Sequence, residues 1–182
     1  MDASDWVDAI VVAVPAGWEE PAILLAEELS ATKVVAAVIG GATRAESVRA
    51  ALAEVPDDAL VVLVHDAARP LVTDAVIERV LGPLSEGWDG VVPGLPIADT
   101  VKSVDGDRIV GTVAREKLVT VQTPQAFPAP TLRDAYAGEL ADATDCAALV
   151  EARGGRITWV EGDAKLLKVT TRADLELVSS WL

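Results

Sequence analysis

The chain has very few of the residues that build disulfide frameworks, metal clusters and aromatic cores. Its 182 residues include one cysteine, one histidine, one phenylalanine and one tyrosine. A single cysteine, Cys146, excludes an intramolecular disulfide framework and a cysteine-rich metal site. It is compatible with a reducing cytoplasm, where we expect the protein to be. We expect Cys146 to be a small core residue and not a nucleophile.

Long apolar runs and positive charge are also scarce. No apolar run approaches the roughly 20 residues of a membrane span, and a basic signal-type start is absent, so we expect no membrane partner. Fifteen Lys and Arg residues face 29 Asp and Glu residues, giving a net charge of −14 that should repel nucleic acid. The basic residues in or beside predicted loops and strand ends are either scattered solubilising charges or, as we favour, a pocket for a phosphorylated ligand. They are Arg44, Arg69, Lys102, Arg108, Arg115, Lys117, Lys165 and Lys168.

Strand and helix patterns alternate along the first half of the chain. This rhythm predicts one α/β domain spanning 1–182, with a mainly parallel sheet and helices on both faces. The expected strands are 6–14, 33–39, 60–64 and 89–92, and the expected helices are 19–29, 44–54 and 73–84.

The pattern changes after residue 96. Two alternating segments, 100–104 and 108–113, surround Asp105-Gly106-Asp107 and predict a β-hairpin. We expect a projecting arm over about 97–117 that packs on a second subunit. Beyond it we expect strands at 118–122, 157–160 and 168–169, and helices at 128–139, 145–153 and 171–182.

The stretch from Leu60 to Pro70 is the centre of the chain. Its first five residues are apolar and rich in valine, which predicts a strand buried on both faces. His65, Asp66 and Arg69 follow at the carboxyl edge of the sheet, where α/β proteins bind ligands. Asp66 can hold a hydroxyl or a metal, and Arg69 can hold a phosphate. The alternative is a structural Asp–Arg pair, and we expect His65 to complete the strand end.

Several short motifs, in order along the chain, resemble one family. They are Gly40-Gly41-x-x-Arg44-x-x-Ser47-Val48, Val64-His-Asp-Ala-Ala-Arg-Pro70, Asp99-Thr100-x-Lys102, Thr112-x-x-Arg115, Gln122-Thr-Pro-Gln-x-Phe127, Thr144-Asp145, Lys168-x-Thr170 and Asp174-Leu175. Each motif is weak alone, but together they are similar to 2-C-methyl-D-erythritol 4-phosphate cytidylyltransferases.

This resemblance implies a Rossmann-like nucleotidyltransferase fold and a homodimer formed through the arm. It implies that CTP and the sugar-alcohol phosphate react, with Mg²⁺ present, to give a CDP-alcohol and pyrophosphate in non-mevalonate isoprenoid biosynthesis. The metal ligands stay unassigned. The implied nucleotide-binding residues are Gly40, Gly41 and Ser47; the implied substrate-binding residues are Asp66, Ala67, Arg69, Thr100 and Thr123; and the implied catalytic residues are Lys168 and Arg115, the latter from the partner's arm.

Two departures from the family pattern matter, and the smaller is Leu166, where the family often has asparagine. The first strand and the glycine-rich loop with its Pro-Lys pair have no match here, so we expect an open sheet edge. We also expect little or no transferase activity from this chain alone. Two alternatives stay open: a ribitol-5-phosphate cytidylyltransferase with the same motifs, and a non-catalytic relative that binds substrate without turnover.

Overall fold

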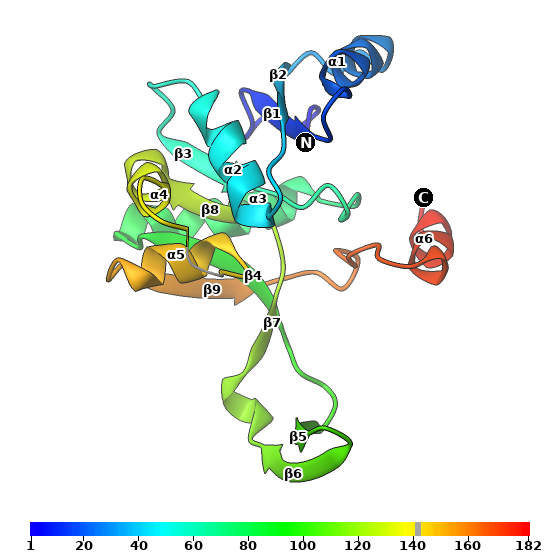
Figure 1. Ribbon diagram of the computed structural model, residues 1–182, viewed down its shortest axis with the longest axis vertical. Helices are drawn as coiled ribbons and strands as arrows, with labels where there is room; N and C mark the ends of the chain where they lie inside the picture. Colours follow the sequence, from blue (N-terminus) through cyan, green and yellow to red (C-terminus); the bar gives the residue numbers. More distant parts are fainter. Residues whose placement is uncertain (141–142) are drawn as a thin grey trace.

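A computed structural model describes residues 1–140 and 143–182 and has an α/β fold (Figure 1). The strands are β1 (Ile10–Val14), β2 (Val34–Ile39), β3 (Val61–Val64), β4 (Gly90–Pro96), β5 (Val101–Asp105), β6 (Arg108–Val113), β7 (Val119–Val121), β8 (Gln125–Pro128) and β9 (Ile157–Glu161). The helices are α1 (Glu19–Glu28), α2 (Arg44–Ala53), α3 (Asp74–Leu81), α4 (Ala129–Tyr136), α5 (Cys146–Ala152) and α6 (Arg172–Ser179), with 3-10 turns η1 (Gly82–Glu86) and η2 (Arg115–Lys117).

The central sheet is mixed, which corrects the expectation of a mainly parallel sheet. Its strands lie in the order β3-β8-β4-β7, and β9 also pairs with β4. The β4–β9 pairing is parallel, whereas β8 pairs antiparallel with both β3 and β4, and β7 pairs antiparallel with β4. The sequence did not reveal β8, because Pro124 precedes this short strand and Pro128 ends it, and prolines so close together mark a loop.

The position of β3 at the edge of this sheet corrects a second expectation. Within the described residues, β3 pairs with β8 alone, so its other edge is unpaired. Leu60 is consequently 84% exposed and Val61 37% exposed. The expected strand at 168–169 is also wrong, because this segment is irregular; Val169 N donates to Ala68 O at 2.8 Å. The other expected elements are present, several with shorter ends.

Helices cover both faces of the central sheet, as expected. On one face, α4 and α5 pack on Phe127 and Val92. On the other, α3 and η1 pack on Ala126 and Val91. Neighbouring residues of one strand thus enter opposite cores, as the period of a β-strand requires. Phe127 has no exposed surface, and a Cβ at Gly90 would lie 2.6 Å from its ring, so the ring fills the space above that glycine.

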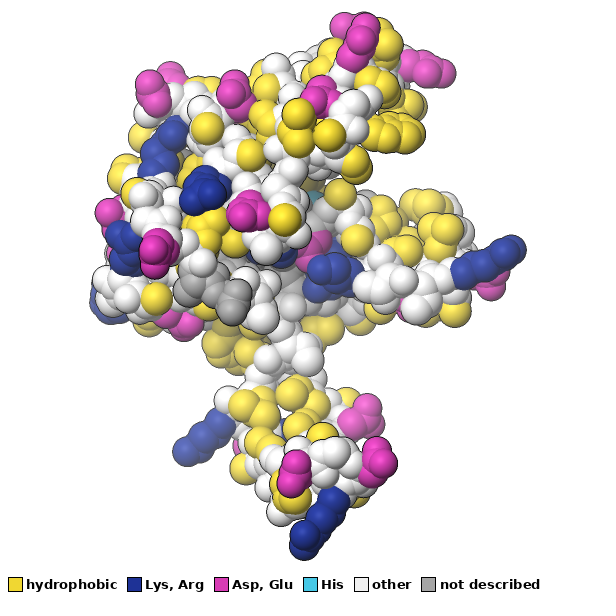
Figure 2. Space-filling model, viewed as in Figure 1, with side chains coloured by type: hydrophobic (Ala, Val, Ile, Leu, Met, Phe, Trp, Pro, Cys, Tyr) yellow, Lys and Arg dark blue, Asp and Glu magenta, His cyan; other side chains and the backbone are white. Residues whose placement is uncertain are grey.

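β1 and β2 form a separate parallel sheet next to α1. The residues of α1 are all partly or fully exposed, including Leu24, Leu25 and its neighbour Trp18. Figure 2 shows hydrophobic side chains gathered at this end of the molecule. This unit therefore has a much smaller core than the central sheet.

The β5–β6 hairpin projects from the body as an arm (Figure 1), which confirms the expected hairpin. Its strands pair antiparallel, and Gly106 adopts a φ of 55° in the turn, a conformation that favours glycine. Val104, Ile109 and Val110 are exposed on this arm. The arm therefore carries apolar side chains outward, where they are available for contact.

Over residues 1–140 and 143–182, none of the helices combines the length and apolar character needed to cross a bilayer.

Candidate functional site

A cavity of about 230 Å³ lies beyond the carboxyl end of β3. The start of α2, the β7–β8 connection, the loop before α5 and the segment after β9 meet here. The residues that line it are Arg44, Asp66, Arg69, Val121, Gln122, Thr123, Gln125, Thr144, Asp145 and Lys168. The expected ligand position at a strand end therefore coincides with a cavity.

Asp66 is the centre of the charges in this cavity. Its Oδ1 accepts from Nε of Arg44 at 3.1 Å, and its Oδ2 accepts from Nζ of Lys168 at 2.9 Å. Nε of Arg69 lies 3.9 Å from the same Oδ2. Three cations from distant parts of the sequence thus surround one carboxylate, and the cluster carries more positive than negative charge.

The pKa of the Asp66 carboxyl lies below its ordinary value. Partial burial works to raise it, but the hydrogen bond from Lys168 and the charge and hydrogen bond of Arg44 together outweigh burial. Asp66 is therefore ionised at neutral pH and holds the cations in place. Asp66 also fixes the turn that follows it, because Arg69 N donates to Asp66 O at 2.9 Å.

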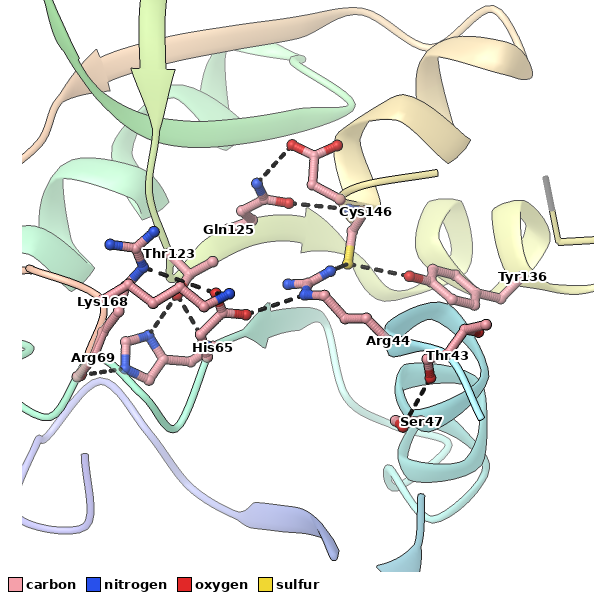
Figure 3. A network of polar contacts seen from close by, with 12 residues as sticks. Thr43, Arg44, Ser47, His65, Arg69, Thr123, Gln125, Tyr136, Cys146 and Lys168 are labelled. Carbon is pink, nitrogen blue, oxygen red and sulfur yellow. Dashed lines mark hydrogen bonds and ion pairs between the residues drawn. The ribbon is translucent and has the colours of Figure 1, made fainter. Parts of the chain in front are cut away.

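The sequence placed Arg44 among the basic residues of a possible phosphate pocket but assigned it no specific contact. A capping box between Thr43 and Glu46 begins α2 and sets Arg44 in its first turn. Its Nη1 donates to Cys146 Sγ at 3.4 Å, and Tyr136 Oη donates to the same sulfur at 3.2 Å (Figure 3). The signal was its place in the first motif, four residues after Gly40, but no sequence pattern pairs Arg44 with Asp66.

Cys146 has no exposed surface, and burial raises the pKa of its thiol. A thiol that is buried and protonated is a poor nucleophile. The expectation of a core residue is confirmed.

A second cluster of polar side chains holds β8 and α5 together on one side of the cavity. Gln125 Nε2 donates to Asp145 Oδ2 at 2.9 Å, while Asp145 Oδ1 accepts from Ala148 N at 3.0 Å and caps α5. Cys146 N donates to Gln125 Oε1 at 3.3 Å. Both oxygens of Asp145 are therefore already occupied by protein donors.

Four of the predicted site residues come together in this cavity: Asp66, Arg69, Thr123 and Lys168. Ala67 is their exposed neighbour. Arg69 Nη1 donates to Leu166 O, so Arg69 also ties the β3 turn to the segment that carries Lys168.

The three predicted nucleotide-binding residues lie at the start of α2: Gly40, Gly41 and Ser47. Within the described residues, none of them lines the cavity. Gly41 N donates to Ser47 Oγ at 3.1 Å, and Ser47 Oγ donates to Thr43 O at 2.9 Å. A Cβ on Gly41 would lie 2.2 Å from the Glu46 Cβ. The packing of the helix start therefore requires this glycine independently of any ligand.

Thr100 and Arg115 are elsewhere in the molecule. Among the described residues, the lining of the cavity includes neither of them. Thr100 is exposed just before β5, and Arg115 is exposed in η2, where its guanidinium donates to Ala98 O. One protomer therefore does not bring Arg115 to Lys168.

The cavity does not form a metal site from protein side chains alone. Across 1–140 and 143–182, the structure contains no group of three or more His, Cys, Asp or Glu side chains placed to hold a metal ion. The two acids of the cavity, Asp66 and Asp145, are both engaged by protein donors.

A second cavity, of about 290 Å³, lies near α4 and the end of α5. Arg153 lines it and pairs with Asp134 at 3.2 Å, and Asp89 lines it as well. The lining thus holds two acids, Asp89 and Asp134, and one cation, and this net negative charge does not suit an anionic ligand. The slightly smaller cavity around Asp66 is the better candidate on chemistry.

We expect acid to destabilise the protein through His65. The pKa of His65 lies below its ordinary value of 6.5, chiefly because burial disfavours the charged ring. As pH falls through about 6.5, His65 binds a proton in the unfolded chain but not yet in the folded chain. The free energy of unfolding therefore decreases until the pH reaches the pKa of His65 in the folded protein. Urea unfolding between pH 8 and 5 should show this loss, and His65→Gln should remove that part of it. A wild-type and variant pair with parallel profiles would contradict the prediction.

Known proteins of one family match this chain along its whole length. The family model for 2-C-methyl-D-erythritol 4-phosphate cytidylyltransferase matches residues 1–182. The enzyme of that name from Nocardia farcinica is 50% identical over 181 residues, which cover 99% of this chain and 76% of the relative. The one from Saccharopolyspora erythraea is 49% identical over 178 residues, covering 95% and 78%. The crystal structure of the Thermus thermophilus enzyme has a TM-score of 0.80 at 36% identity, covering 95% of this chain and 81% of that one.

Proposed function

The chain belongs to the 2-C-methyl-D-erythritol 4-phosphate cytidylyltransferase family, and from that premise we propose that the cavity around Asp66 is its catalytic centre. As a member, it is a nucleotidyltransferase of isoprenoid biosynthesis that uses CTP and a sugar phosphate. The comparisons give no support to the ribitol phosphate or non-catalytic alternatives.

The convergence of three cations on Asp66 is the observation that carries this proposal. Transfer of a nucleotidyl group needs alignment of the phosphates and stabilisation of negative charge more than it needs a protein nucleophile. Lys168 is suited to this because its side chain is 45% exposed and pairs with Asp66 at 2.9 Å. An incoming phosphate can therefore contact the ammonium group while Asp66 keeps it oriented. Arg44 supplies a second cation on the opposite side of the carboxylate.

We place the nucleotide at the start of α2, beside the cavity. Gly40 and Gly41 follow β2 and lie against the side chains of Ser47 and Glu46, so the turn into α2 is tight. The free N–H groups of a helix start favour a negatively charged or polar ligand. This supports the roles that the resemblance implies for Gly40, Gly41 and Ser47, with the sugar phosphate between Asp66, Thr123 and Lys168.

We propose that Mg²⁺ enters with CTP and is not held in advance by the protein. Mg²⁺ commonly binds through substrate phosphates with one or two carboxylates. Here Asp66 is the acid nearest the cations, and it is already paired. Bound metal would offset phosphate charge. In electron-spin-resonance spectra, the protein alone should therefore leave free Mn²⁺ unchanged, and it should alter the spectrum of Mn²⁺ already bound to CTP. Binding of Mn²⁺ without CTP would contradict this.

We propose a homodimer in which the arm of each protomer completes the partner's cavity. The exposed apolar residues of the arm, among them Val104 and Ile109, support such a contact, and so does the position of Arg115 outside the lining of its own cavity as described. A C2 arrangement would exchange the two arms symmetrically.

Mixing two defective variants tests this exchange. Arg115→Ala and Lys168→Ala should each weaken binding of the sugar phosphate about tenfold or more. In a mixed dimer, the cavity that keeps Lys168 would receive an intact Arg115 from its partner. An equal mixture should then regain tight binding at about one quarter of all cavities, as random pairing predicts. Calorimetry counts these sites, and a mixture no better than its components would refute action across the dimer.

Binding selectivity tests the function itself. Calorimetry should detect CTP with Mg²⁺ and 2-C-methyl-D-erythritol 4-phosphate, with ribitol 5-phosphate at least tenfold weaker, a difference of about 1.4 kcal/mol. Preference for ribitol phosphate would overturn the proposed substrate, and failure to bind either would overturn the site.

We also propose a cytoplasmic location. The one cysteine is buried and unpaired, which is compatible with a reducing compartment. Cell fractionation measures this directly, and recovery with membranes would contradict it.

A further inference from the structure

His65 is the single histidine of the chain and lies between β3 and Asp66. Both of its ring nitrogens have partners. Nε2 lies 2.9 Å from Arg69 O, and Nδ1 lies 3.2 Å from Thr123 Oγ1 (Figure 3). The ring thus joins the turn after β3 to the segment before β8.

The partners determine where the hydrogen atoms are. A carbonyl oxygen can only accept, so Nε2 must carry a hydrogen and donate it to Arg69 O. Burial lowers the pKa of His65, so the ring is neutral and Nδ1 carries no hydrogen. Nδ1 therefore accepts, and the Thr123 hydroxyl must donate its single hydrogen to it.

The hydroxyl of Thr123 has a second partner in the backbone. Asp66 N donates to Thr123 Oγ1 at 2.9 Å. A hydroxyl has one hydrogen and two lone pairs. With the hydrogen given to His65 and one lone pair taken by Asp66 N, one lone pair is left for a ligand.

Thr123 lines the cavity, so this remaining lone pair decides what it can recognise. It can accept from a hydroxyl, but it has no hydrogen to offer a phosphate oxygen. The phosphate is left to the cations at Lys168 and Arg44.

We propose that His65 is a positioning residue that orients the Thr123 hydroxyl, so that Thr123 accepts a hydrogen bond from a hydroxyl group of the sugar-alcohol phosphate. This inference rests on the proposed function and assigns the orientation of one contact within it.

The first test needs no ligand. A protein labelled with ¹⁵N-histidine gives signals from His65 alone, and at pH 7.5 Nδ1 should resonate in the downfield range of an unprotonated ring nitrogen, with Nε2 in the range of a protonated one. The reverse tautomer, or a doubly protonated ring, would overturn the inference. This result is independent of whether the sugar phosphate binds.

Two substitutions at His65 test the contacts of its two ring nitrogens separately. His65→Asn keeps an acceptor near the Nδ1 position for Thr123, whereas His65→Gln keeps a donor near the Nε2 position for Arg69 O. We expect calorimetry to show His65→Asn binding 2-C-methyl-D-erythritol 4-phosphate within about twofold of wild type, and His65→Gln about fivefold or more weaker, the effect of one hydrogen bond. CTP binding should be unchanged in both.

The comparison is checked in a Thr123→Val background, where His65→Gln should cause no further loss of binding. Equal losses in His65→Asn and His65→Gln, or an additional loss in the valine background, would overturn the inference and indicate a general structural role. If wild-type protein did not bind the sugar phosphate, the proposed function would fail, while the nitrogen spectrum would still decide the His65–Thr123 contact.

Discussion

Replacing Phe127 with alanine is expected to lower the free energy of unfolding by about 3–5 kcal/mol. Phe127 has no exposed surface, lies on β8 in the middle of the central sheet, and packs with α4 and α5. Its removal leaves a cavity between the sheet and two helices that rigid strands cannot close. Urea unfolding monitored by circular dichroism at pH 7.5 measures the loss.

Phe127→Leu is the matched control, because it keeps most of the buried apolar volume and should lose less than half as much stability. The same strand begins at Gln125, two residues after Thr123, so the alanine variant should also bind the sugar phosphate less well. An alanine variant within about 0.5 kcal/mol of wild type, the range of an ordinary surface substitution, would show that β8 is not central to the core.

Replacing Lys168 with alanine should weaken binding of 2-C-methyl-D-erythritol 4-phosphate at least tenfold, or about 1.4 kcal/mol. The ammonium group pairs with Asp66 at 2.9 Å and lines the cavity, so its loss removes a cation from the position we assign to the phosphate. Stability should change little, because the side chain is half exposed and such pairs contribute little. Calorimetry with wild type and variant measures the difference.

Lys165→Ala is the matched control for charge. Lys165 is exposed on the same segment and lies outside the cavity lining as described. It should bind like wild type. Equal weakening in both variants would indicate a general effect of net charge, and unchanged binding in Lys168→Ala would remove Lys168 from the site.

The sequence predicted most elements of the fold because their patterns are local. Alternation identified β5 and β6, and helical spacing identified α2 and α6, whose starts the structure shows to be capped by Thr43 and Thr171. It failed for β8, since four residues ending in Pro128 carry little periodicity and their strand character comes from pairing with β3 and β4. It also failed for the burial of β3, which depends on what lies beside that strand.

The candidate site was predictable to the extent that its residues follow strand ends. Asp66 and Arg69 follow β3, and that placement alone indicated a ligand site. The pairing of Arg44 with Asp66 was missed because the contact spans 22 residues and joins two elements whose packing no local pattern specifies. The resemblance implied both Thr100 and Arg115, but their place on the arm leaves their role to be tested in the assembled protein.

The cation cluster around Asp66 has a consequence for how an anionic ligand approaches. The molecule as a whole carries a net charge of −14, so at low ionic strength it repels nucleotides over long distances. At physiological ionic strength, charges separated by more than about 8 Å are largely screened, whereas contacts as short as those at Asp66 are not. Repulsion by the acidic surface and attraction by the cavity thus act over different distances. Salt in the surrounding solution weakens the long-range repulsion more than the short-range attraction. It therefore assists the approach of an anionic ligand to the cavity.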